Sequence, residues 1–206
     1  MLRIFDTHAH YDDEAFDADR EEVLSLIGVQ GVRKVCDIGA GIESSRTALE
    51  LSKKHDNMYC ALGVIPGKCS EINEESWKWL CEKAESESKC VAIGEIGLDY
   101  HWDDDPKEVQ ALWFGNQMEL AGKLGKPIVV HSRDAAKDTI DIMKEHNASG
   151  IGGVIHCYSY TKESKYPVPN LQAKPTLQMR FQIRKQFPSK FRKPCGRASS
   201  NLPQQN

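Results

Sequence analysis

The sequence has 206 residues, of which 40% are hydrophobic and 28% are charged, and its formal net charge is −3. This length suits one α/β domain, and the small net charge excludes a general electrostatic preference for nucleic acid or membrane surfaces. Seven cysteines form no CxxC pair, and the opening residues MLRIFDTHAH lack the apolar run of a signal peptide. We therefore expect reduced thiols and a cytoplasmic protein without a membrane span.

Charge is distributed unevenly along the chain. Residues 1–161 carry 17 Lys and Arg against 29 Asp and Glu, whereas residues 162–206 carry 10 against one, together with six of the nine prolines. This break predicts a folded unit over 1–161 and a basic, proline-rich, irregular tail over 162–206. The tail could be a nucleic-acid arm. We favour the alternative, a segment foreign to the fold such as a shifted reading frame produces, because it replaces elements that the fold needs.

Short apolar runs alternate with helix-sized segments along the first 160 residues. Between the third run, at residues 58–64, and the fourth, at residues 91–97, the spacing is helical for Trp77, Leu80, Cys81 and Ala84. Buried strands that alternate with helices predict a parallel sheet, either an open doubly wound sheet or a (β/α)₈ barrel. No glycine-rich phosphate loop follows the first run to favour the open sheet. The six predicted strands are residues 2–8, 33–39, 58–64, 91–97, 127–132 and 152–157.

A second helical pattern follows the stretch DPKE at residues 105–108. Asp105 is expected to cap this helix, with Pro106 at the first helical position and Glu108 completing a capping box. One apolar face is predicted for the helix, formed by Val109, Leu112, Trp113, Leu120, Ala121 and Leu124.

Histidines and one glutamate occur at the ends of the predicted strands. An isolated HxH pair is most often polar surface, but further histidines behind buried runs require partners, and a metal ion would satisfy all of them. In a parallel barrel such strand ends meet on one face. A mixed set of nitrogen and oxygen ligands suits Zn²⁺ or Mn²⁺ and partly Mg²⁺, and one glutamate could bridge two ions about 3.5–4 Å apart for hydrolysis. The residues are His8 and His10, which alternate with Asp6, then Glu95, His131 and His156.

Four motifs resemble the TatD family of metal-dependent deoxyribonucleases in order and spacing. They are FDTHAH at 5–10, GEIGLDYHWD at 94–103, QMELAGKLGKPIVVHSRDA at 117–135 and GGVIHCYSY at 152–160. The resemblance implies a hydrolase of the amidohydrolase superfamily with a TIM (β/α)₈-type barrel. Here the barrel is expected to be incomplete, with about six β/α units before the irregular tail.

The resemblance also implies two divalent metal ions, Zn, Mn or Mg, and hydrolysis of phosphodiester bonds in DNA by a metal-activated water. By motif, His8 and His10 would bind the first ion, His131 and His156 the second, and the catalytic Glu95 would bridge both. DNA is the expected partner, and no obligate protein partner is indicated. The residues expected to line the substrate cleft are Asp99, Tyr100, Ser132 and Arg133, and an arginine there can bind a phosphate bidentately.

The sequence departs from the family pattern at two points. Ile65, in LGVIPGK, stands where the family has the histidine of a Gly-x-His-Pro motif. No aspartate follows Asp141, so the family's strand-eight aspartate, in Glu-Thr-Asp-x-Pro, has no match. We therefore expect impaired activity, with a metal-binding remnant without turnover as the alternative. A small-molecule amidohydrolase is a further alternative, but it usually bridges its metals with a carboxylated lysine where this chain has Glu95.

Overall fold

The computed structural model describes residues 4–102, 104–157 and 160. Neighbouring strands in this part of the chain all pair in parallel, and their order in the sheet is their order in the chain. Each predicted apolar run overlaps one strand, so the prediction of six strands is confirmed. They are β1 (Ile4–Ala9), β2 (Val32–Ile38), β3 (Met58–Leu62), β4 (Cys90–Asp99), β5 (Ile128–Arg133) and β6 (Gly153–Ile155).

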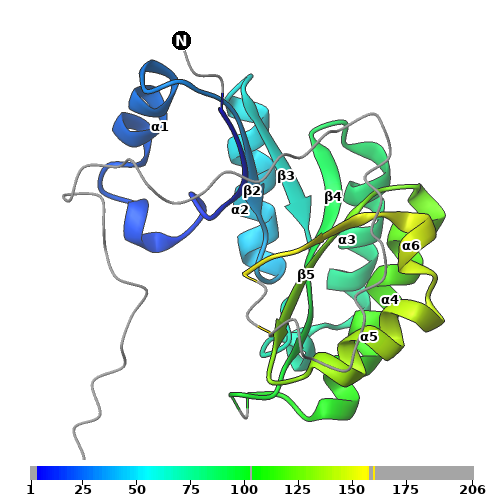
Figure 1. Cartoon of the computed structure of the whole chain (residues 1–206). Helices are drawn as coiled ribbons and strands as arrows, with labels where there is room; N and C mark the ends of the chain where they lie inside the picture. Colours follow the sequence, from blue (N-terminus) through cyan, green and yellow to red (C-terminus); the bar gives the residue numbers. More distant parts are fainter. Residues whose placement is uncertain (1–3, 103, 158–159, 161–206) are drawn as a thin grey trace, which may run out of the picture.

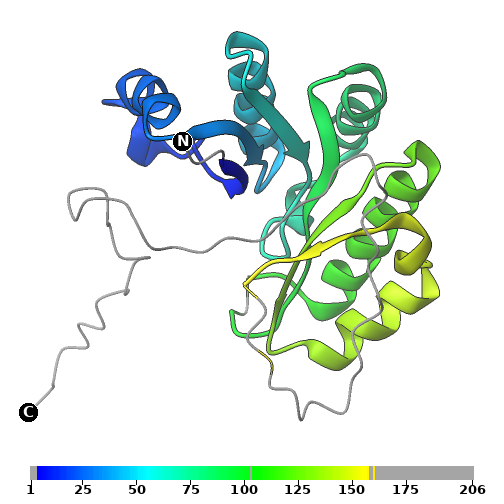
Figure 2. The same cartoon turned by 45° about the horizontal axis from the view of Figure 1, so that its top comes forward.

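Helices connect the strands and lie along the outer side of the curved sheet (Figures 1 and 2). The described α-helices are α1 (Arg20–Val29), α2 (Ile42–Lys54), α3 (Glu74–Ser86), α4 (Lys107–Leu124), α5 (Ala136–Glu145) and α6 (Ala148–Ile151). Two short 3₁₀ helices are η1 (Glu14–Phe16) and η2 (Cys69–Glu71). Among the helices of the described segments, none combines the length and the apolar character that crossing a bilayer requires.

The strand order decides between the two predicted architectures. In a doubly wound sheet the strand order reverses at a switch point, so it differs from the order in the chain. The order β1 to β6, with helices outside, is instead that of a (β/α)₈ barrel, of which these six strands form a part. The prediction of about six units of a TIM-type barrel is confirmed. The domain boundary at 161 and the irregular tail 162–206 lie outside the described residues.

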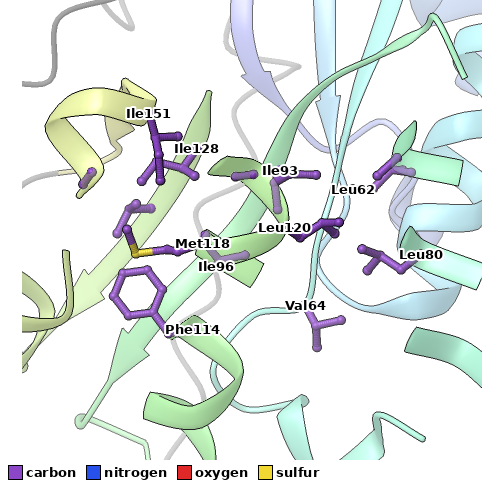
Figure 3. Close-up of a cluster of buried hydrophobic side chains, with 14 of the residues drawn as sticks. Leu62, Val64, Leu80, Ile93, Ile96, Phe114, Met118, Leu120, Ile128 and Ile151 are labelled. Carbon is purple, nitrogen blue, oxygen red and sulfur yellow. The ribbon is translucent and has the colours of Figure 1, made fainter. Parts of the chain in front are cut away.

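Side chains alternate between the two faces of the sheet, as the strand period of two requires. Outward-facing strand residues pack against helix residues in a large buried cluster, part of which Figure 3 shows. It includes Leu62, Ile93, Ile96 and Ile128 of the strands and Phe114 and Met118 of α4. A second buried cluster contains residues at the alternate positions: Cys36, Ile38, Ala61, Ala92 and Val129. By the same alternation, the positions that follow Val129 on this inner face are 131 and 133.

Helix α4 begins one residue later than predicted. Its N-cap is Pro106, which makes no capping hydrogen bond, so the prediction of Asp105 as the cap is wrong. The buried Asp105 carboxylate instead accepts hydrogen bonds from the backbone N–H of Ser70, at 3.3 and 3.2 Å. This carboxylate therefore fixes the η2 turn to the start of α4.

The buried face of α4 also differs from its prediction. Leu112 is 59% exposed, whereas Phe114 and Met118 are fully buried. The reason is that two glutamines occupy the face that packs on the sheet. Gln117 bridges to both backbone groups of Val64, at 2.8 and 3.1 Å, and Gln110 accepts from a backbone N–H of β4. An apolar count ignores these amides and so rotates the predicted face toward Leu112.

Candidate active site

Glu95 is the centre of the candidate site. It lies toward the carboxyl end of β4, and its side chain is only 6% exposed. Its Oε2 lies 3.4 Å from His8 Nε2 and 3.8 Å from His10 Nε2. Its Oε1 lies 3.2 Å from His131 Nδ1 and directly contacts His156 Nε2. The fold therefore brings together all five residues that the sequence singled out as ligands.

The surrounding histidines keep Glu95 ionised. Burial alone would raise the pKa of Glu95, because a charge in the interior loses its hydration. Contacts with His131, His156 and His8 outweigh this and hold the pKa well below its usual range. The site therefore contains a carboxylate that stays negative at physiological pH.

Neighbouring acceptors orient two of the histidines. His131 Nε2 lies 2.8 Å from Asp99 Oδ2, and His10 Nδ1 lies 2.9 Å from the backbone carbonyl oxygen of Ile38. Burial lowers the pKa of His131, but the carboxylates of Glu95 and Asp99 outweigh it and raise that pKa overall. Metal-binding histidines typically donate their second ring N–H to such an acceptor, which fixes the tautomer and the ring direction. Both rings thus keep their other nitrogen facing Glu95.

The buried nitrogens of His8 show whether the site suits a metal ion. Neither Nδ1 nor Nε2 makes a hydrogen bond among the described residues, although Nε2 lies 3.4 Å from Glu95 Oε2. The His8 ring stacks on the His156 ring, with 4.1 Å between the ring centres. One ligand atom from each of His8, Glu95 and His156 lies within 4.8 Å of the other two. A buried polar nitrogen without a partner is costly, and ligation of a cation would satisfy it. The donor set fits a divalent metal ion.

A cleft of about 750 Å³ includes Glu95, His10 and His131 in its wall. Its cationic residues are Lys68 and Arg133, so its charge is predominantly negative. A phosphate would be repelled from such a surface unless bound cations offset the carboxylates. Ile65, at the position of the family histidine, also lines this cleft. The further carboxylates in the wall are Asp12, Asp13, Glu14, Glu43, Asp99 and Asp104.

The four residues expected to bind substrate divide between two faces of the sheet. Asp99 and Arg133 line the cleft. The Tyr100 hydroxyl instead donates to a carboxylate oxygen of α5 at 2.9 Å, and the Ser132 hydroxyl lies 2.8 Å from a threonine hydroxyl of the same helix. Neither side chain is among those that line the cleft. The period-two alternation accounts for this, because each follows or precedes an inward-facing residue by one position.

Two buried carboxylates beside the site carry no sequence prediction. Asp37, on β2, is fully buried, and its Oδ1 accepts the backbone N–H of Tyr11 at 2.6 Å. Burial, with a further contribution from the charge of Asp12, raises the pKa of Asp37 to about 7. Asp12 accepts the Ser44 hydroxyl at 2.5 Å. The sequence contains one indication of Asp37, because this aspartate lies inside the apolar run RKVCDIG, where a charge is unexpected.

Comparison with known proteins shows the family to which the chain belongs. A family model described as "TatD related DNase" matches residues 5–186. The chain belongs to the TatD-related DNase family. This TatD chain is 39% identical over 160 residues to the uncharacterized metal-dependent hydrolase YabD of Bacillus subtilis. The aligned region covers 78% of the chain and 62% of YabD.

A solved structure and one further relative extend the comparison. The crystal structure of YjjV, a TatD homologue from Escherichia coli K12, matches with a TM-score of 0.71 and 32% identity, over 78% of this TatD chain and 62% of YjjV. A protein of Cronobacter sakazakii named "3'-5' ssDNA/RNA exonuclease TatD" is 29% identical over 160 residues, 78% of the chain and 60% of that protein. The chain thus spans less than two thirds of the length of these relatives.

Proposed function

We propose that the protein hydrolyses phosphodiester bonds in DNA with a water molecule activated by divalent metal ions. The observation that carries this proposal is the buried Glu95 carboxylate, which lies in the wall of a cleft and is surrounded by four imidazoles. The exonuclease name of the Cronobacter sakazakii relative supports nucleic acid as the class of substrate.

The two oxygens of Glu95 support the assignment of two ions, which we take to be Zn, Mn or Mg. Oε2 faces His8 and His10, and Oε1 faces His131 and His156. We assign one histidine pair to each ion and Glu95 to both. When bound, such ions supply Lewis acidity, which lowers the pKa of water and polarises a phosphoryl oxygen.

Protein groups around the centre orient the ligands and receive the substrate. Asp99 holds His131, and the Ile38 carbonyl holds His10, so that their ligand nitrogens keep a fixed direction. Arg133 lines the same cleft, and its guanidinium can donate two parallel hydrogen bonds to one phosphate. The negative cleft makes phosphate binding depend on the cations, which couples substrate binding to the loaded site.

No described residue is assigned as the general base. The aspartate that the family resemblance places on strand eight has no counterpart among the described residues. Loss of a general base lowers a rate by about 10²–10⁴-fold. Hydrolysis by the described residues alone is therefore proposed to be slow, and the competing proposal is a metal-binding protein without turnover.

Metal content and nuclease activity, measured on the same preparations, test the proposal. Plasmid and single-stranded DNA are incubated with the protein and Mn²⁺, and bound metal is quantified by mass spectrometry after gel filtration. The Glu95→Ala variant should lose both metal and DNA cleavage. The control is Glu145→Ala, since Glu145 is an exposed glutamate at the end of α5, away from the cleft. Full cleavage by Glu95→Ala would overturn the proposal, and stoichiometric metal without any cleavage would favour the metal-binding protein.

A further inference from the structure

Trp102 is a large apolar side chain exposed in the wall of the cleft. Its side chain lines the cleft together with Arg133, and the residue is 51% exposed. The other large exposed apolar residues of the described chain, Leu26, Val29 and Leu112, lie on α1 and α4 and do not line it. An exposed indole costs free energy in water, so its position beside a charged site points to a ligand with an aromatic face.

Polar neighbours surround the indole. The Arg133 guanidinium carbon lies 5.4 Å from the centre of the Trp102 ring, and the His101 ring meets it edge-on at 4.6 Å and 90°. His101 is itself held by Asp134, at 3.1 Å between Nδ1 and Oδ2. The surroundings are therefore charged and hydrogen-bonded, unlike the apolar patch that a protein interface usually buries at its centre.

The strand geometry ties this indole to the metal centre. Arg133 follows His131 by two positions on β5, so both project from the inner face, about 7 Å apart along the strand. Asp99, which orients His131, is the register partner of Arg133, and the backbone N–H of Tyr100 donates to the Arg133 carbonyl at 2.9 Å. Trp102 follows the end of β4, the strand that carries Glu95, by three residues and lines the same cleft as Glu95 and His131.

We propose that Trp102 and Arg133 form a subsite for one unpaired nucleotide, in which the indole stacks on the base and the guanidinium binds the phosphate. This subsite rests on the proposed nuclease function, since it assigns the neighbouring phosphate to the metal centre. Every nucleobase has a π-face, so such stacking tolerates any sequence. A base inside a duplex is already stacked and paired, and only an unpaired base offers its face. The subsite therefore selects single-stranded DNA or an unpaired end.

Arginine and tryptophan are expected to contribute in different ways. Stacking on an aromatic side chain strengthens binding by roughly 5- to 150-fold per base. A phosphate contact, in contrast, does not depend on whether a base is present. The two contributions can be separated with an oligonucleotide that keeps its backbone and lacks its bases.

Fluorescence anisotropy with two labelled probes tests the subsite. The probes are an oligothymidylate and an abasic oligodeoxyribose phosphate of equal length, both with phosphorothioate linkages that slow hydrolysis, in the presence of Mn²⁺. The wild-type protein should bind the oligothymidylate roughly 5- to 150-fold more tightly. Trp102→Ala should bind the two probes equally, Trp102→Phe should keep most of the preference, and Arg133→Gln should weaken both probes by the same factor.

Leu112→Ala is the matched control, because it removes an exposed apolar side chain outside the cleft and should leave the preference unchanged. A preference that persists in Trp102→Ala, or a wild-type protein that binds the two probes equally or not at all, would overturn the subsite. Failure of the nuclease proposal gives a different result. In that case unmodified DNA stays intact, while the Trp102-dependent preference remains.

Discussion

The two walls of the cleft differ in chemistry. The acidic wall, formed by Asp12, Asp13, Glu14 and Glu43, follows β1 and β2. The β4–β5 wall presents Trp102 and Arg133 beside the carboxylates of Asp99 and Asp104. Glu95 faces the β1 histidines with one oxygen and the β5–β6 histidines with the other. Only the β4–β5 wall combines a guanidinium with an exposed indole, which can receive a phosphate and its base. The two sides of one barrel end can thus differ in side-chain chemistry across a single carboxylate.

Removing the charge of Glu95 should have the largest effect on this arrangement. Glu95→Gln keeps the side-chain shape but loses an anionic ligand that both histidine pairs face. We expect the affinity for Zn²⁺ or Mn²⁺ to fall by at least about 100-fold, more than the loss of an orienting group causes. Isothermal titration calorimetry measures this, with Glu145→Gln as the control. Unchanged affinity would contradict the role of Glu95.

Asp99→Asn should have the next largest effect, because Asp99 orients His131 without being assigned as a ligand. An amide cannot stabilise the ring as the carboxylate does, and loss of such a partner lowers metal affinity by about 10- to 100-fold. The same calorimetric titration detects the change. Asp56→Asn, at an exposed loop position, serves as control. Equal affinities of the two variants would show that the β4–β5 wall does not support the metal centre.

The pH dependence of stability tests the buried carboxylate of Asp37, which does not line the cleft. The folded-state pKa of Asp37 is about 7, against 3.8 ordinarily. Its protonated form therefore favours folding at low pH, and this contribution is lost as the pH rises through about 7. Between about pH 5.5 and about pH 8, metal-free wild-type protein should lose about 2 kcal/mol of unfolding free energy relative to Asp37→Asn. Urea denaturation of both proteins at both pH values measures this difference. An equal change in unfolding free energy for wild type and Asp37→Asn would refute the raised pKa of Asp37.

Tyr100→Phe should have the smallest effect. The hydroxyl donates to Asp138 of α5 on the helix-facing side, so its loss should cost about 0.5–1.5 kcal/mol of unfolding free energy. Affinity for the oligothymidylate should stay at the wild-type value, because Tyr100 does not line the cleft. A drop comparable to that of Trp102→Ala would place Tyr100 in the substrate site and contradict the division of the two faces.

Much of the fold follows from the sequence because buried parallel strands are apolar and short. The apolar runs around Glu95, His131 and His156 each form a strand, and the order of these strands brings the three side chains together. Leu112 and Asp105 were predicted wrongly because the helix packs through glutamine amides and the carboxylate caps a different turn. Such polar contacts depend on tertiary neighbours, which hydrophobic periodicity does not record.

The sequence predicted the residues around Glu95 more completely than those that line the rest of the cleft. Motif similarity predicts that Asp99, Tyr100, Ser132 and Arg133 all line the cleft, although neighbouring residues of a strand face opposite sides of the sheet. The alternation along β4 and β5 instead places Tyr100 and Ser132 on the helix side. Trp102 lies in the loop after β4, where no period applies, and its exposure follows only from the three-dimensional structure.

Anomalous X-ray diffraction from crystals grown with Mn²⁺ would locate the metal ions relative to Glu95. We expect two anomalous peaks beside Glu95, one on the side of His8 and His10 and one on the side of His131 and His156, and we expect both to disappear in Glu95→Gln crystals. Peaks confined to the carboxylates of the acidic wall, or peaks beside residue 95 that persist in the variant, would contradict this expectation.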